Sequence, residues 1–510
     1  MPSVSLIVEA LRARPAGVFW AAALAQAFLW VLVPALFYAS PPGDLPEMLA
    51  IGHEGQLGSW HGPPLAFWLA ELAFQAAGAR PIGAYVLAQV CVLAAYWAIF
   101  ALGRTFVGAQ HAAMAVLLMS GVLAFSAPTP EFGPAVLAMP LTGATLLCFW
   151  RAIGEGRRNY WVAFAFALGL LLLATYWGLV LAALLACFML VTREGRAALA
   201  TIDPWAAVLV ALLVPFPHFA WLWQSGVLSG LATALPSPGE LAARLPRWLL
   251  LLGAVLASHI GLAVLIILAS GWRADRRIEA PEIERPAVKP FARRFVFFLA
   301  LALPLAGTLA AAASARIVTP ASAGQLVLMS GLAAVVAAGN RIVLHRQDVL
   351  GATWFAVLLL PPILIVGAMA VVPWTVALEL SSQQPAAAMG HFFSDIFRRR
   401  TGAPLEIVAG DSPVPYLIAA ASTDRPRVFM TANPERTPWL DGPAVQAKGA
   451  IVVWRMQEAT GEPPAVIRAR FPELVAEIPQ TFERPVQGLL PPYRIGWGLI
   501  RPQPTIAPAR

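Results

Sequence analysis

The feature that most constrains the fold is a series of long apolar segments, each close to the roughly 20 residues that a helix needs to cross a bilayer. Apolar residues make up 59% of the chain and charged residues 12%, about half the charged share of a soluble domain. The composition therefore excludes a water-soluble protein and predicts a polytopic α-helical membrane protein. Eleven spans are predicted, at about residues 18–38, 81–103, 110–126, 134–152, 160–175, 177–192, 204–222, 248–269, 294–314, 320–339 and 349–372.

The first span is predicted to be retained, because it is too long for the apolar core of a signal peptide and lacks a small-residue cleavage site. If the N-terminus is cytoplasmic, most Lys and Arg before residue 373 fall in loops on the cytoplasmic side, including the run from Arg273 to Arg294. The positive-inside rule then places the first loop, and everything after about Val372, outside the cytoplasm. The near absence of lysine suggests a GC-rich bacterial genome, which concerns coding and not mechanism.

Composition changes at about residue 372, which predicts two domains. Residues 1–372 form the transmembrane domain, with an outer acidic loop at 39–80 and a solvated cytoplasmic linker at 270–293. Residues 373–510 are Pro-rich and contain the strand-like runs LEIVAG, RVFM and AIVVW between helix-like stretches. This alternation predicts a small periplasmic α/β domain, and its length suffices to bury a core of its own.

The outer loop is the acidic part of this basic chain, because it has no Lys or Arg before Arg80. Asp44 and Glu47 are three residues apart, at the start of a predicted amphipathic helix, so both carboxylates would share one polar edge. Its apolar face could lie on the membrane surface. Alternatively, Asp44 and Glu47 form a capping box, which is a structural role compatible with the first. The other ionisable residues of the loop are His53, Glu54, His61 and Glu71.

Further ionisable residues near membrane depth are candidates because such positions are costly for charge. Glu131 lies in a very short outer loop, from which it could reach the same cleft as Asp44; the alternative is a carboxylate in water. His218 lies near the outer end of its span, where a hydrogen-bonded helix-end histidine is the commoner case. His53, Glu54 and His61 could bind a divalent ion, but their spacing matches no tight metal motif.

Four basic residues are predicted near the outer membrane surface before the terminal domain: Arg80, Arg244, Arg247 and Arg316. An anionic lipid headgroup there would be bound largely by these guanidinium groups; alternatively, each one snorkels to the interface. The sequence contains no P-loop, dinucleotide glycine motif, GxSxG or HExxH, so nucleotide hydrolysis and zincin or serine-hydrolase chemistry have no support. The three cysteines lie in apolar runs and indicate neither disulfides nor a metal site.

Taken together, these motifs resemble the bacterial integral-membrane glycosyltransferases of the GT-C fold, which are related to protein O-mannosyltransferases and lipid A aminoarabinose transferases. The resemblance covers most of residues 15–225 and parts of the terminal domain. In the outer loop it rests on Asp44, Glu47, Gly58, Trp60, Pro63, Pro64, Leu65, Trp68 and Leu69. Glu131 takes the place of a second outer-loop acid, and His218 lies in a Pro-His-x-x-Trp segment. Thr175 precedes Tyr176 where relatives carry a lysine.

The resemblance implies a catalytic domain that transfers a sugar, with inversion, from a polyprenyl-phosphate donor to an acceptor hydroxyl on lipid A, another glycan, a lipid or a protein. Asp44 would act as general base, while Glu47 and Glu131 position the acceptor or a cation. Arg80, Arg244 or Arg247 would balance the leaving phosphate. No metal ligand is assigned, and a need for a divalent cation stays open. The remaining substrate-binding candidates are His53, Trp60, His61, Pro63, Pro64, Tyr176 and His218.

Two other classes of protein are alternatives to a glycosyltransferase. A transporter or flippase of a lipid-linked glycan precursor would explain the spans, but it would not explain an acidic outer loop with a folded outer domain, and no inverted repeat is visible. A structural scaffold would use the acids only to cap helices, and it predicts that Asp44, Glu47 and Glu131 are individually dispensable.

Overall fold

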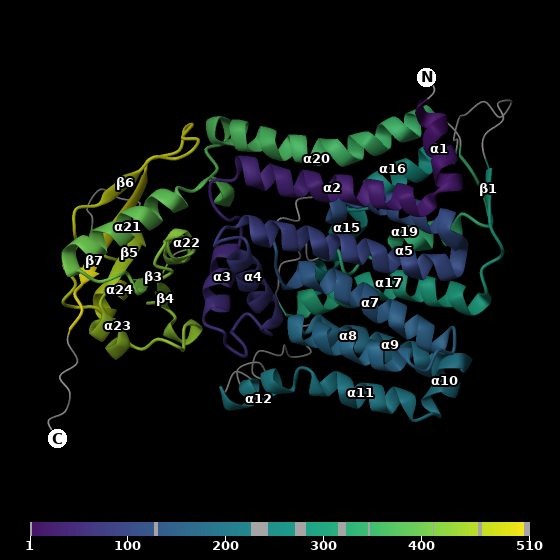
Figure 1. The fold of residues 1–510 in the computed structure, drawn as a ribbon, viewed down its shortest axis with the longest axis horizontal. Coiled ribbons are helices and arrows are strands. Elements are labelled where there is room, and N and C mark those ends of the chain that lie inside the picture. Colours follow the sequence, from purple (N-terminus) through teal and green to yellow (C-terminus); the bar gives the residue numbers. More distant parts are fainter. Residues whose placement is uncertain are drawn as a thin grey trace. The chain divides into compact units, whose positions relative to one another are not determined.

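The computed structural model describes residues 3–126, 131–225, 243–270, 282–314, 323–344, 347–411, 413–456 and 462–503, and it consists of two compact units (Figure 1). The first, called the helical unit, contains Met1–Leu32, His61–Ala66 and Ala84–Ile363. The second, called the mixed unit, contains Val33–Trp60, Phe67–Gly83 and Leu364–Arg510. The mixed unit is therefore built from chain segments that lie far apart in the sequence.

The helical unit is made of apolar helices and one short hairpin. Its long helices α2, α5, α7 and α17 run side by side in Figure 1. The hairpin pairs β1 with β2 in antiparallel fashion. The elements are α1 Ser3–Ala13, α2 Pro15–Phe37, α5 Ile82–Met119, α6 Leu123–Ser126, α7 Pro134–Ile153, α8 Tyr160–Ala174, α9 Trp177–Val191, α10 Arg193–Leu199, α11 Asp203–Leu213, α12 Phe216–Gln224, α15 Leu245–Ala257, α16 Ile260–Ala269, β1 Glu282–Glu284, α17 Pro290–Ala313, α19 Ser330–Ala337, β2 Arg341–Val343 and α20 Gln347–Thr375.

Among the described residues, six helices are long and apolar enough to cross a membrane, or up to eight if each of two bent helix pairs is one span. The chain is thus a helical, polytopic membrane protein, as predicted. The count of eleven spans stays a prediction. One element, α5, contains the predicted span at about 81–103 and the first part of the span at 110–126, and it is interrupted at Gly108, whose φ of 78° is non-helical. Arg316 and residues 271–281 of the predicted linker lie outside the described residues.

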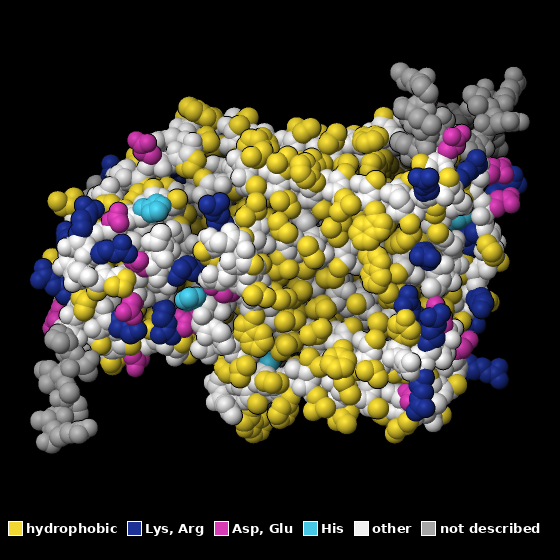
Figure 2. Space-filling view, in the orientation of Figure 1, with side chains coloured by type: hydrophobic (Ala, Val, Ile, Leu, Met, Phe, Trp, Pro, Cys, Tyr) yellow, Lys and Arg dark blue, Asp and Glu magenta, His cyan; other side chains and the backbone are white. Residues whose placement is uncertain are grey.

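Aromatic side chains fill the core of the helical unit. Phe149 of α7, Phe188 of α9 and Phe295 of α17 are buried, with ring centroids 5.4 to 6.5 Å apart. On the outside, hydrophobic side chains cover the face of the helical unit in Figure 2; Phe28 and Leu209, for example, are more than half exposed. Such a surface is stable in contact with lipid.

The mixed unit combines two helices of the outer loop with an α/β sheet. The strand order is β4-β3-β5-β7-β6, with β3 parallel to β4 and β5, and β7 antiparallel to β5 and β6. The predicted strands LEIVAG, RVFM and AIVVW correspond to β3, β4 and β5. The elements are α3 Leu45–His53, α4 Leu65–Ala76, η1 Ser381–Gln383, α21 Ala386–Thr401, β3 Ile407–Gly410, α22 Val414–Ala421, β4 Arg427–Met430, η2 Pro434–Arg436, α23 Gly442–Lys448, β5 Ala450–Arg455, α24 Ala465–Arg470, β6 Gln480–Phe482 and β7 Tyr493–Ile500.

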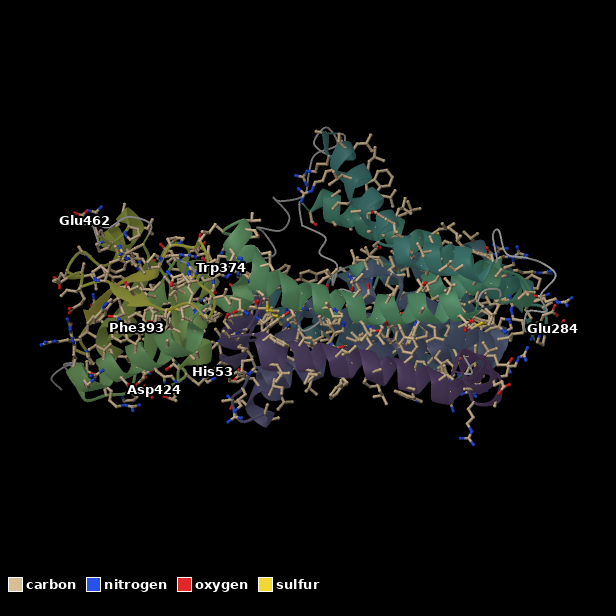
Figure 3. The ribbon with its side chains drawn as sticks, turned by 90° about the horizontal axis from the view of Figure 1, so that it is seen from above. His53, Glu284, Trp374, Phe393, Asp424 and Glu462 are labelled. Carbon is tan, nitrogen blue, oxygen red and sulfur yellow. The ribbon has the colours of Figure 1, made fainter. Side chains whose placement is uncertain are left out.

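Both faces of this sheet are buried, because successive side chains of a strand point to opposite faces. Val408 of β3 packs with Phe393 of α21, which is fully buried and labelled in Figure 3. Its neighbour Ile407 packs on the other side with Val445 of α23 and Ile467 of α24. The sheet is therefore a central layer with helices on both faces.

Candidate active site

The outer-loop helix α3 begins directly after Asp44, as predicted. Pro46 occupies the first turn, where its missing N–H costs no intrahelical hydrogen bond. Asp44 is exposed and makes no capping hydrogen bond, so the capping box considered from the sequence is not formed. Its carboxylate has no hydrogen-bond or ion-pair partner among the residues that the structure describes. This leaves the carboxylate of Asp44 accessible.

Glu47, in the first turn of α3, is held by the sheet-containing part of the mixed unit. Its carboxylate accepts a hydrogen bond from the hydroxyl of Tyr416 on α22. Burial, followed by the charge and hydrogen bond of Glu47, raises the pKa of Tyr416, while Arg436 acts in the opposite direction. Tyr416 therefore keeps its proton at neutral pH and remains a donor. Ala50 of the same helix packs against Tyr416 and Val428.

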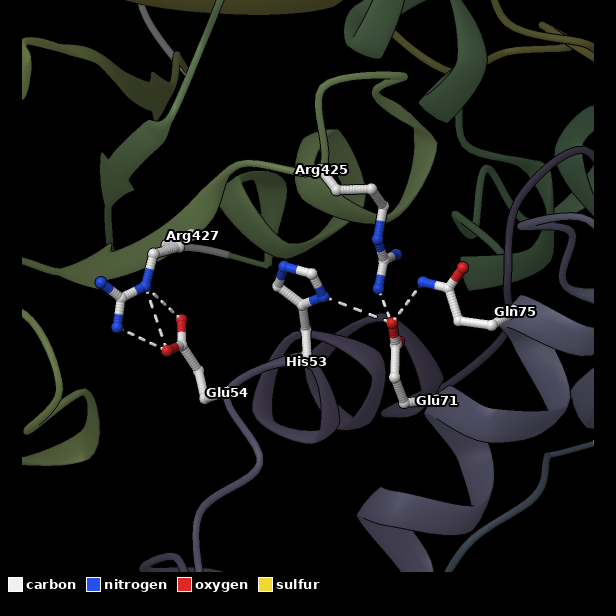
Figure 4. Close-up of polar contacts among 6 residues, drawn as sticks. All are labelled: His53, Glu54, Glu71, Gln75, Arg425 and Arg427. Carbon is white, nitrogen blue, oxygen red and sulfur yellow. Dashed lines mark hydrogen bonds and ion pairs between the residues drawn. The ribbon is translucent and has the colours of Figure 1, made fainter.

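Glu54, directly after α3, is bound by Arg427 at the start of β4 (Figure 4). Arg427 donates from Nε to both carboxylate oxygens, at 2.8 and 3.0 Å, and from Nη2 to Oε2 at 2.5 Å. The Glu54 side chain is 6% exposed and that of Arg427 32%. A carboxylate this buried needs a counter-charge, so the ion pair fixes the end of α3 to the sheet.

A second, parallel connection joins α4 to the turn before β4 (Figure 4). The Glu71 carboxylate accepts hydrogen bonds from Arg425 Nη2 at 2.6 Å and Gln75 Nε2 at 2.7 Å, and His53 Nδ1 lies 3.3 Å away. The Arg425 guanidinium also lies 4.5 Å from the centroid of Phe74. Arg425 adopts a left-handed backbone with φ of 49°, which costs about 1–2 kcal/mol in a residue with a Cβ. The side-chain contacts offset this strain.

The Glu71 contacts predict a pH dependence of stability. Burial opposes ionisation of Glu71, but hydrogen bonds from His53 and Gln75 and the charge of Arg425 outweigh it, so the pKa lies below the ordinary 4.5. A depressed pKa stabilises the fold above the ordinary value, and this contribution is lost as the pH falls through the lowered value. We expect the melting temperature of Glu71→Gln to lie below that of wild type at pH 7, and the difference to shrink as the pH falls below about 4.5. A difference independent of pH would contradict this.

Three of the four loop carboxylates, Glu47, Glu54 and Glu71, thus have side-chain partners that the sequence analysis missed. Arg425 and Arg427 flank a proline just before a predicted strand. The available signal was charge complementarity, since the loop contains Glu54 and Glu71 but no basic residue before Arg80. Nothing local connects two segments that are more than 350 residues apart.

In the helical unit, the structure brings together three segments that the resemblance singled out. Tyr176 lies in the turn between α8 and α9, and its hydroxyl is 3.1 Å from Nε2 of the fully buried His218 on α12. Gly62, with φ of 135°, faces the Tyr176 ring, where a Cβ would lie 3.8 Å from Cε2. Next to it, His61 is half-buried, while Pro63 and Pro64 are buried.

The other candidates occupy varied environments. Arg244, at the N-cap of α15, donates to the carbonyl oxygen of Ala313 at the C-terminal end of α17, which complements the helix dipole. Arg247 is half-buried in the first turn of α15. Glu131 is exposed just before α7, and Arg80 is exposed after α4. Trp60 stacks with Arg436 in the mixed unit.

The described residues contain no group of three or more His, Cys, Asp or Glu side chains arranged to hold a metal ion. His53 and Glu54, considered as metal ligands, contact Glu71 and Arg427 instead. The helical unit also contains an apolar cavity of about 840 Å³, lined by α2, α5, α16, α19 and α20, with Ala21, Leu118 and Trp354 among its lining residues.

Comparison with known proteins gives consistent results. Residues 61–221 match the family model of dolichyl-phosphate-mannose-protein mannosyltransferases. The fold is similar to that of ArnT from Cupriavidus metallidurans bound to undecaprenyl phosphate, with a TM-score of 0.61, 12% identity, and coverage of 97% of this chain and 99% of the other. For apo ArnT the TM-score is 0.58 and the identity 13%, covering 95% and 97% of the two chains. No curated protein matches in sequence.

Proposed function

We propose that the chain is a membrane glycosyltransferase of the GT-C fold that transfers a sugar from a polyprenyl-phosphate donor to an acceptor hydroxyl, because one segment matches a mannosyltransferase family model and the fold is similar to that of ArnT. The proposed reaction inverts the anomeric carbon and takes place at the periplasmic face of a bacterial inner membrane. The observation that supports it most is the fold match over 97% of the chain to a protein with bound undecaprenyl phosphate. The N-terminus would then be cytoplasmic, with eleven spans.

In the proposed mechanism, Asp44 accepts the proton of the acceptor hydroxyl as its oxygen attacks the anomeric carbon. The bond between that carbon and the phosphate oxygen breaks, and polyprenyl phosphate leaves with the electron pair. Asp44 suits this role because it is exposed and forms no capping hydrogen bond. Glu47, held by Tyr416, and Glu131 would position the acceptor or a cation.

The leaving phosphate needs donors of positive or polar character. Arg244 and Arg247 on α15, together with Arg80, are the basic candidates, and Tyr176 with His218 offers polar hydrogens where relatives carry a lysine. The apolar cavity of about 840 Å³ between the helices is large enough to accommodate part of a lipid chain.

Substitution of Tyr176 tests its proposed contact with the donor. We expect Tyr176→Phe to raise the KM for the donor about fivefold with little change in kcat, because loss of one neutral hydrogen bond is worth roughly 1 kcal/mol. Steady-state transfer rates at varied donor concentration measure this. Tyr160→Phe is the matched control, since it removes a tyrosine hydroxyl that bonds Arg151 in the same unit. An unchanged KM in Tyr176→Phe would assign this hydroxyl a structural role.

The function itself is tested by incubating the purified full chain in detergent with a radiolabelled polyprenyl-phosphate sugar and an envelope fraction from a deletion strain. Covalent transfer of label to an acceptor supports the proposal, and mass spectrometry of the labelled product identifies sugar and acceptor. A flippase makes no new covalent bond. Donor movement across vesicles without any transfer would therefore favour the transporter class and refute the transferase.

A further inference from the structure

Arg436 forms an unusual platform with Trp60 in the mixed unit. Arg436 ends η2, and its guanidinium carbon lies 3.9 Å from the centroid of the Trp60 indole. Trp60 is 45% exposed, so the stacked pair borders solvent. Stacking on an aromatic face restricts the guanidinium to one plane but leaves its N–H edges available to other groups.

Among the described residues, no carboxylate neutralises the charge of the platform. Three other arginines of the mixed unit, Arg398, Arg425 and Arg427, bind Asp424, Glu71 and Glu54, respectively. In contrast, Arg436 has no carboxylate within ion-pair distance in the part of the chain that the structure describes. A preorganised guanidinium without a counter-ion is the geometry that binds phosphate or carboxylate oxygens in a bidentate manner.

The charge of Arg436 also acts on Tyr416, the residue that holds Glu47. Arg436 is close enough to Tyr416 to influence its pKa, and Tyr416 donates its hydroxyl hydrogen to Glu47 in the first turn of α3. Tyr416 therefore interacts with the first turn of α3 by a hydrogen bond and with Arg436 through its charge. An anion bound by Arg436 would be held near the end of α3 that carries Asp44.

We infer that the edge of Arg436, held on Trp60, binds an anionic group of a substrate, either a phosphate or a carboxylate. This inference rests on the proposed function. It adds that one substrate carries an anionic group bound by Arg436, a residue that was not among the sequence candidates. Two sources supply such a group: the phosphate of the lipid donor, and a phosphate or carboxylate on the acceptor glycan or lipid.

The test uses the full chain in lipid nanodiscs with Arg436→Gln and Arg436→Lys, and with Arg399→Gln as matched control, because Arg399 is an exposed arginine of the same unit. One arm measures the Kd for undecaprenyl phosphate. The other arm measures the acceptor constant, which is the concentration of envelope fraction that gives half-maximal transfer. It is measured with untreated envelope fraction and with envelope fraction from which hydrofluoric acid has removed phosphate. Melting temperatures verify that each variant is folded.

We expect Arg436→Gln to weaken one of the two constants about tenfold, the value of one charge-assisted contact, with kcat retained and partial recovery in Arg436→Lys. A weaker Kd for undecaprenyl phosphate identifies the donor. A weaker acceptor constant identifies the acceptor, and phosphate is the group if hydrofluoric acid removes the difference. If both constants of Arg436→Gln stay within twofold of those of wild type, the inference is wrong. If wild type transfers no sugar, the proposed function fails, and the Kd arm alone decides whether Arg436 binds a phosphate.

Discussion

Replacing Asp44 by Asn is expected to lower kcat for sugar transfer by about 10²- to 10⁴-fold, the usual contribution of a general base. The amide keeps the size of the side chain but cannot accept the proton of the acceptor hydroxyl. Since the Asp44 side chain makes no capping hydrogen bond, the melting temperature should stay within about 1 °C of wild type, as expected for a surface substitution. Transfer rates at saturating donor and acceptor measure the effect.

The matched control is Asp395→Asn, which removes an exposed carboxylate from α21 of the same unit and should leave the rate unchanged. Transfer by Asp44→Asn within twofold of wild type would place the base elsewhere, and Glu131→Gln would then be the next variant to measure. If neither substitution slows transfer, the scaffold interpretation of these acids gains support.

The largest expected effect on stability comes from Arg427→Ala. It would leave the Glu54 carboxylate, 6% exposed, without its bidentate partner. Removing one partner of a buried pair costs several kcal/mol, and we discount this to about 2 kcal/mol because Arg427 itself is 32% exposed. The melting temperature should fall by about 4–8 °C, which differential scanning fluorimetry of the detergent-solubilised protein measures.

Two further variants distinguish the ion pair from packing of the arginine stem. In the double variant Glu54→Gln with Arg427→Ala, much of the loss should be recovered, because no charge remains buried. Arg468→Ala removes an exposed ion pair with Glu462 and should change the melting temperature by less than about 2 °C. Equal losses in the single and double variants would show that the charge of Glu54 is not the cause.

Local pattern predicted the elements whose residues carry their own signal. The apolar run predicted as a span at 134–152 forms α7. The runs LEIVAG, RVFM and AIVVW form β3, β4 and β5, close to their predicted bounds. The strands β6 and β7 were not predicted, because glycines interrupt β7, and Gly496 and Gly498 are buried only through tertiary packing. The predicted helix start at Asp44 is correct. The considered capping interaction is absent, since the Asp44 side chain makes no capping hydrogen bond.

Contacts across long sequence separations could not be predicted from one sequence. The pairing of Tyr176 with His218 spans 42 residues. Both were candidates for substrate binding, but their hydrogen bond depends on where the fold places the turn before α9 relative to α12. Arg425, Arg427 and Arg436 were not among the candidates at all. Their roles depend on which acidic or aromatic side chain the fold places opposite them, and residue type alone does not specify that partner.

The discontinuous construction of the mixed unit has a consequence for biosynthesis. Glu71 leaves the ribosome 354 residues before its partner Arg425, and Glu54 leaves it 373 residues before Arg427. At about 5–20 residues per second, each acid waits roughly 20–70 s for its counter-charge. The loop at 39–80 is therefore synthesised long before its two counter-charges, and α3 acquires its final anchoring only after Arg427 has been made. A nascent chain without residues 425–427 lacks both ion pairs, so the anchoring of the helix that follows Asp44 depends on synthesis of this later segment.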